Sequence, residues 1–175
     1  ADPWSVGPGN MNNDLYNMFF AEKVIQEFKP ELLVVNMQDV DICHFDFTRY
    51  ADSLHKADFA VAKLWQAIQS TPGMANDTVL IVVPEHGRNQ IPNTVIDQFG
   101  RYAIDHTAID QTSGDQMSRE IFCLVVGPPG IVRQDQVISQ VRGESIDIVP
   151  TVAQLLGFDT DIPVGVRPPG QNLGD

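Results

Sequence analysis

The sequence predicts an α/β fold in which a largely parallel sheet is flanked by helices. Apolar runs at 32–37, 78–83 and 121–126 predict three buried strands, and the last two are continuous, which is typical of strands that are covered on both faces. Segments with helical spacing precede or follow these runs, and parallel strands need such crossover connections. Polar clusters come directly after the first two runs, at the carboxyl ends of the strands, where open α/β sheets bind their ligands.

The first predicted helix begins at Asn13 or Asp14, either of which can cap it, and Pro30 stops it. Its apolar residues keep roughly one face: Leu15, Met18, Phe19, Ile25 and Phe28. The second helix has apolar residues at spacings of three and four and ends at Pro72 and Gly73. These apolar residues are Tyr50, Leu54, Ala57, Val61, Leu64, Trp65 and Ile68.

The third predicted helix covers 146–156, after the last strand. Pro150 lies near its first turn, where a missing amide hydrogen is tolerated, and Gly157 caps its end. The stretches 1–12 and 163–175 are rich in Pro and Gly and predict irregular structure. A length of 175 residues with 43% hydrophobic content predicts one domain around a single core.

The charge balance excludes several classes of partner. Eleven basic residues against 23 acidic ones give a net charge of -12, which opposes binding to nucleic acid or anionic membranes unless cations intervene. A site for phosphate would therefore need a metal. No stretch approaches the roughly 20 apolar residues of a membrane span. Two cysteines are too few for a disulfide framework; we expect Cys43 to serve packing and Cys123, inside an apolar run, to be buried.

The strand ends carry candidate metal ligands. Asp39, Asp41 and His44 follow the first strand, and Glu85 and His86 follow the second. Carboxylate and imidazole groups can bind one divalent cation together. His106 lies in the long loop before the third strand and can converge on the same edge, whereas His55 lies within the second helix and is expected to be solvated. The alternative is that all of these are ordinary polar loop residues.

Five short motifs occur in an order that resembles the carboxyl-terminal half of the alkaline phosphatase superfamily. They are Asp41-Ile42-Cys43-His44, the segment 77–88 with Glu85-His86-Gly87-Arg88, Asp105-His106, the segment 121–130 and the segment 147–157. The superfamily includes phosphatases, phosphodiesterases of the nucleotide pyrophosphatase type, sulfatases and cofactor-independent phosphoglycerate mutases. The resemblance implies a metal-dependent hydrolase of phosphate esters, phosphodiesters or sulfate esters, acting on a small anionic ester.

The resemblance assigns Asp41, His44 and His106 to one divalent metal, and Glu85 and His86 to a second. Two zinc ions are expected, with Mn²⁺ or another transition ion as the alternative. Two features depart from the family pattern. Its acid and His are usually separated by three residues, whereas two residues separate Asp41 from His44 and four separate Asp39 from His44; Asp41 is the first choice and Asp39 the second. Glu85 stands where the family generally has Asp.

The family's nucleophile, a Ser, Thr or modified Cys at the start of a helix, belongs to its amino-terminal half. No segment before residue 30 can supply both this nucleophile and the upstream Asp ligand, so no catalytic nucleophile is identified. The chain is therefore expected to be the carboxyl-terminal part of a larger hydrolase whose missing amino-terminal half completes the site. Arg88 can contact a substrate oxyanion, although a bond to a loop carbonyl or carboxylate is the alternative.

Three interpretations remain open at this point. The chain is part of a phosphoric or sulfuric ester hydrolase, a non-catalytic metal-binding or interaction module of the same fold, or a generic doubly wound α/β domain. The residues do not separate phosphate from sulfate, or monoesters from diesters. The resemblance and the lack of cysteine pairing fit an exported bacterial enzyme, and the residues do not exclude the cytoplasm.

Overall fold

The computed structural model of the chain describes residues 14–43, 47–87 and 120–158. The chain falls into two compact units, Ala1–Val132 and Arg133–Asp175. The organisation as a single domain stays a prediction. The elements in chain order are α1 (Asp14–Phe28), the 3₁₀ turn η1 (Asp41–Cys43), α2 (Phe47–Ser70), β1 (Leu80–Val82), β2 (Leu124–Val126), the 3₁₀ turn η2 (Ser145–Asp147) and α4 (Ile148–Leu155).

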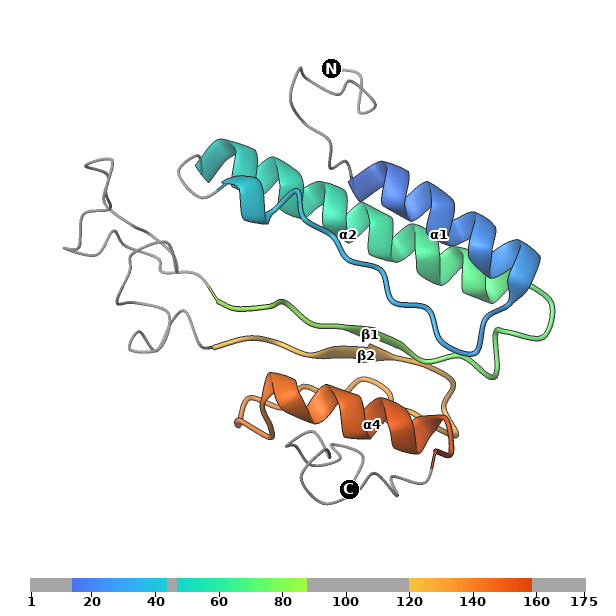
Figure 1. Cartoon of the computed structure of the whole chain (residues 1–175). Helices are drawn as coiled ribbons and strands as arrows, with labels where there is room; N and C mark the ends of the chain where they lie inside the picture. Colours follow the sequence, from blue (N-terminus) through green and yellow to red (C-terminus); the bar gives the residue numbers. More distant parts are fainter. Residues whose placement is uncertain (1–13, 44–46, 88–119, 159–175) are drawn as a thin grey trace. The chain divides into compact units, whose positions relative to one another are not determined.

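Helices α1 and α2 pack against each other and form the hydrophobic core of the first unit (Figure 1). Both were predicted, and α1 ends two residues before Pro30, whose ring cannot continue a helix. The core is built from Leu15, Met18, Ala21 and Ile25 of α1 and from Ala60, Leu64, Ala67 and Ile68 of α2. Three of these eight residues are alanines, which let the two helices approach closely.

The apolar faces of the two helices differ in part from the prediction. Phe19 and Phe28 are 42% and 77% exposed, and Leu54 of α2 is 48% exposed, so all three lie outside the core. The prediction left out the three alanines of the core, Ala21, Ala60 and Ala67. Because alanines fill the contact between the helices, the buried face is rotated away from some of the large apolar residues.

The strand predicted at 32–37 is wrong: within the described residues this segment has no pairing strand. Side chains alternate only in its second half, since Leu32, Leu33 and Val34 are exposed while Val35 and Met37 pack against the helical core. The prediction relied on the apolar character of the segment and not on this alternation. A strand also needs a partner for its backbone hydrogen bonds, and a local apolar pattern does not show whether one is present.

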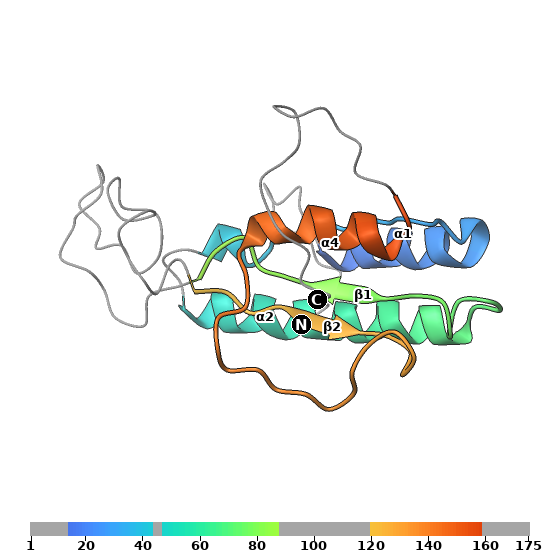
Figure 2. The same ribbon diagram turned by 90° about the horizontal axis from the view of Figure 1, so that it is seen from below.

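The other two predicted strands are present but shorter, and they pair side by side (Figure 1 and Figure 2). They run antiparallel, with Leu80 opposite Val126 and Val82 opposite Leu124. The predicted largely parallel sheet is therefore wrong for the described strands. Continuous apolar runs do not encode strand direction, which depends on how the chain returns through residues 88–119, outside the described part.

The two strands are also less buried than predicted. The side chains of β1 are half-buried, while Leu124 and Val125 of β2 are 45% and 41% exposed. Cys123, next to β2, is exposed, so the prediction that it is buried is wrong. Enough protein still surrounds its sulfur that partial burial raises the pKa of the thiol.

Helix α4 of the second unit confirms the prediction made from Pro150 and Gly157. Pro150 is the third residue of the helix, where its missing amide hydrogen has no acceptor to lose. Gly157 has a φ of +71°, and its amide bonds to the carbonyl of Gln154 while the amide of Phe158 bonds to that of Ala153. This is the Schellman arrangement that ends many helices. No helix in the described part of the chain combines the length and the apolar character needed to cross a membrane.

Candidate metal-binding segments

Asp41, a predicted ligand, is the first residue of the turn η1 and is exposed. Two backbone hydrogen bonds close this turn, from the Ile42 amide to the Gln38 carbonyl and from the Cys43 amide to the Val40 carbonyl, both 3.3 Å long. The backbone thus curls back on itself around Asp41. The conformation of the turn therefore fixes the position of the Asp41 backbone, from which the carboxylate extends.

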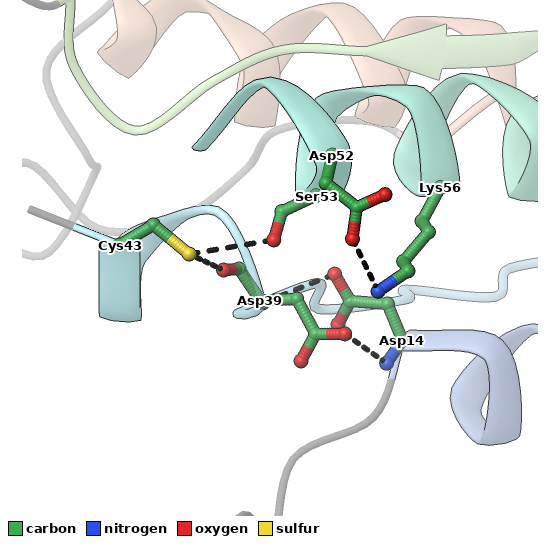
Figure 3. A network of polar contacts seen from close by, with 6 residues as sticks. All are labelled: Asp14, Asp39, Cys43, Asp52, Ser53 and Lys56. Atoms are coloured by element: carbon green, nitrogen blue, oxygen red, sulfur yellow. Dashed lines mark hydrogen bonds and ion pairs between the residues drawn. The ribbon is translucent and has the colours of Figure 1, made fainter. Parts of the chain in front are cut away.

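Cys43 ends the turn and is only 3% exposed. Its thiol donates to the carbonyl oxygen of Asp39 over 3.1 Å and lies 3.4 Å from the hydroxyl of Ser53 in α2 (Figure 3). Ser53 is itself buried. The predicted packing role of Cys43 is confirmed, and the thiol also ties η1 to α2.

Asp39, which precedes this turn, and Asp14, at the start of α1, form a reciprocal pair (Figure 3). The side-chain carboxylate of each accepts the backbone amide of the other. The Asp14 side chain accepts the amides of Gln38, at 2.8 Å, and of Asp39, at 3.1 Å. The Asp39 side chain in return accepts the amide of Asp14, at 3.1 Å, and so caps the first residue of α1. Asp39, the second choice as a metal ligand, is thus engaged with the helix.

Both carboxylates of this pair are buried. Asp14 is fully buried and Asp39 is 9% exposed, and the buried Oδ1 of Asp39 has no hydrogen-bond partner within the described segments. Burial raises the pKa of the Asp14 carboxyl above its usual value. The amides of Gln38 and Asp39 oppose this rise, and the Asp39 carboxylate adds to it.

The sequence prediction missed this pair. It treated Asp14 as a cap for its own helix and Asp39 as a ligand. The two residues are 25 positions apart in the chain, and neither a helical nor a strand-like spacing relates them. An acidic residue at a helix start and another before a turn were the only available signals.

Glu85 and His86 follow β1, as predicted, with Val83 and Pro84 between the strand and the pair. Glu85 is exposed, and His86 and Gly87 are half-buried. The Nδ1 atom of His86 lies 2.7 Å from the carbonyl oxygen of Gly87. Because a carbonyl only accepts, this bond requires the hydrogen on Nδ1, and in the neutral ring Nε2 is then the nitrogen with the lone pair that a metal would use.

The remaining predicted site residues, His44, Arg88 and His106, lie outside the described residues. Within the described segments, no group of three or more His, Cys, Asp or Glu side chains is placed to hold a metal ion. The assembly of the five predicted ligands into two sites therefore stays a prediction. His55 is exposed on α2, which confirms that it is solvated.

Residues 9–141 match the sequence model of the type I phosphodiesterase/nucleotide pyrophosphatase family. The chain belongs to this family. It is thereby a member of the alkaline phosphatase superfamily, which confirms the resemblance seen in the motifs. No curated protein and no solved structure matches the chain significantly.

Membership in this phosphodiesterase family narrows the reaction classes that the motifs left open. The family is of the metal-dependent hydrolase type and comprises type I phosphodiesterases and nucleotide pyrophosphatases. Sulfate esters, which the motifs left open, gain no support. The matched range also includes every candidate ligand, from Asp41 to His106.

Proposed function

We propose that the chain supplies metal ligands for the hydrolysis of phosphodiester or pyrophosphate bonds in small anionic substrates. The observation that carries this proposal is the family match, which spans the whole interval holding the candidate ligands. The net charge of -12 agrees with a small substrate, since a nucleic-acid polyanion would be repelled.

The ligand roles follow the motif order. Asp41, His44 and His106 would hold one divalent metal, and Glu85 and His86 would take part in a second site. A bound metal pair supplies positive charge that polarises the phosphoryl group and stabilises the leaving oxygen. Arg88, two residues after His86, would bind the substrate's anionic oxygens through its paired N–H donors.

The local structure at His86 supports a metal role. Histidines that bind metals commonly donate their other ring N–H to a carbonyl or carboxylate, which fixes the tautomer and the orientation of the ring. The bond from Nδ1 of His86 to the Gly87 carbonyl is of this kind. Imidazole and carboxylate donors together suit Zn²⁺, with Mn²⁺ as the alternative.

Calorimetric titration of the metal-free chain with Zn²⁺ and with Mn²⁺ tests the proposal. We expect stoichiometric binding by the native chain and an affinity at least about tenfold lower for His86→Ala. Loss of a group that only orients a metal ligand lowers metal affinity by about this factor, and loss of the ligand itself should lower it at least as much. His55→Ala is the matched control, because His55 is an exposed histidine on α2, and it should leave the affinity unchanged.

Absence of stoichiometric binding, or equal losses in the two histidine variants, would contradict the metal role. A second readout separates the hydrolase from the non-catalytic module. We expect the zinc-loaded native chain to hydrolyse bis(4-nitrophenyl) phosphate only if the chain itself holds a competent nucleophile. Zinc binding without turnover would leave the chain as the metal-binding part alone.

A further inference from the structure

We propose that Asp14, at the start of α1, is a positioning residue for the metal ligand Asp41. This inference rests on the proposed function, because it requires Asp41 to bind metal. Asp14 lies far from Asp41 in the chain and belongs to none of the motifs that pointed to the site. It acts through the backbone that leads into η1.

The link between the two residues runs through Gln38 and Asp39. Asp14 accepts the amide hydrogens of both, using one carboxylate oxygen for each. The carbonyl of Gln38 then accepts the amide of Ile42, the bond that closes the backbone around Asp41. Asp14 thus holds the amide of Gln38, and the carbonyl of the same residue accepts one of the two hydrogen bonds that close the turn.

Asp14 is itself held in place. Its backbone amide donates to the carboxylate of Asp39, so that each aspartate binds the backbone of the other. The carbonyl of Asp39 accepts the thiol of Cys43, whose sulfur also lies against Ser53 of α2. The turn is therefore anchored to α1 before Asp41 and to α2 after it (Figure 3).

The burial of Asp14 argues against a role that is limited to packing. A fully buried carboxylate is costly, and an apolar side chain of similar volume often serves stability as well or better. What an apolar side chain cannot do is accept two amide hydrogens at once. The feature that distinguishes Asp14 is therefore its hold on the two amides that precede the turn.

A double-mutant cycle on zinc affinity tests the inference. Asp14→Asn keeps the shape of the side chain but presents an NH₂ group to one of the two amides, so one bond is lost. We expect the affinity to fall roughly 10- to 100-fold, the range seen when groups that orient a ligand are removed. In an Asp41→Asn background the same change should produce no further fall. If Asp14→Asn does not fold, Asp14→Ser enters the same cycle.

Asp52→Asn is the matched control. It removes a carboxylate on α2 that pairs with Lys56 over 2.8 Å, and it should leave zinc affinity unchanged. Amide hydrogen exchange in the metal-free chain gives an independent readout: Gln38 and Asp39 should exchange faster in Asp14→Asn and at the native rate in Asp52→Asn.

The outcomes separate this inference from the proposed function. A native chain that binds no zinc overturns the metal role, and the positioning role falls with it. A native chain that binds zinc and loses affinity on Asp41→Asn, but not on Asp14→Asn, overturns the positioning role alone. Equal losses from Asp14→Asn with and without Asp41 also overturn it, because a general structural effect does not depend on the ligand.

Discussion

The two segments that carry the described candidate ligands are held in different ways. The turn with Asp41 is tied to Asp14, more than 20 residues earlier, and to Ser53 on α2. The segment with Glu85 and His86 continues from β1, and its His86 ring bonds to the next residue along the chain. The position of Asp41 thus depends on two packed helices, and that of His86 on the strand pair and on local geometry.

Packing follows the same division. The helix pair contains the buried hydrophobic cluster of the first unit, whereas β1 is half-buried and β2 partly exposed. Buried contacts resist distortion because few rearrangements fill a cavity once it is made. We therefore expect the largest effects of substitution in the helix pair.

Leu64→Ala should produce the largest loss of stability. Leu64 is 5% exposed within the cluster between α1 and α2, and deletion of a buried leucine costs about 2–5 kcal/mol of unfolding free energy. Leu54→Ala on the same helix is the control. Leu54 is 48% exposed, and its loss should stay within about 0.5 kcal/mol. Urea unfolding followed by tryptophan fluorescence measures both, and equal losses would refute the assignment of the buried face.

The contrast between Leu64 and Leu54 also shows how far the sequence could lead. Caps, prolines and periodicity predicted the helices, but both leucines fit the same spacing, and the small residues that decide the contact carry little hydrophobic signal. The apolar runs predicted β1 and β2 but not their direction, because direction is a property of the connection between them.

Prediction of the site divides in the same way. Asp41 and Glu85-His86 were predicted as ligands because each is a local motif next to a predicted element, and their role stays a prediction. The Asp14–Asp39 pair was missed because it joins residues 25 positions apart through backbone amides, which every residue possesses. Long-range contacts of this kind appear only when the chain is folded.

Gly127→Ala probes the strand side of the comparison. A methyl group on Gly127 would lie 2.6 Å from a γ-methyl of Val132 and 3.2 Å from one of Val79, so side chains must move. Such overpacking costs about 1–3 kcal/mol. Gly130→Ala is the matched control, since nothing lies within 4 Å of its added methyl group. The same urea measurement compares them. A Gly127→Ala protein as stable as Gly130→Ala would contradict the prediction, because it would show that the side chains of Val132 and Val79 move aside without a loss of stability.

The smallest expected effect is a pH dependence that has opposite signs at the two aspartates used above. Burial raises the pKa of Asp14 above its ordinary value of 3.8, so the native state binds this proton more tightly than the unfolded state does. Its ionisation therefore lowers stability as the pH rises from 3.8 through the raised pKa. Hydrogen bonding to Lys56 lowers the pKa of Asp52, whose contribution is instead present above 3.8 and lost as the pH falls through the lowered value.

Urea unfolding between pH 3 and pH 7, with a chelator to remove metal, measures both contributions. Relative to Asp14→Asn, the native chain should gain stability as the pH falls; relative to Asp52→Asn, it should lose stability over the acidic end of the range. The second effect should be the weaker, because an exposed ion pair is screened by solvent. Parallel curves for the native chain and Asp14→Asn would mean that the folded state does not hold the Asp14 carboxyl in a buried setting. The anchor on the α1 side of the Asp41 turn would then be looser than the contacts around it indicate.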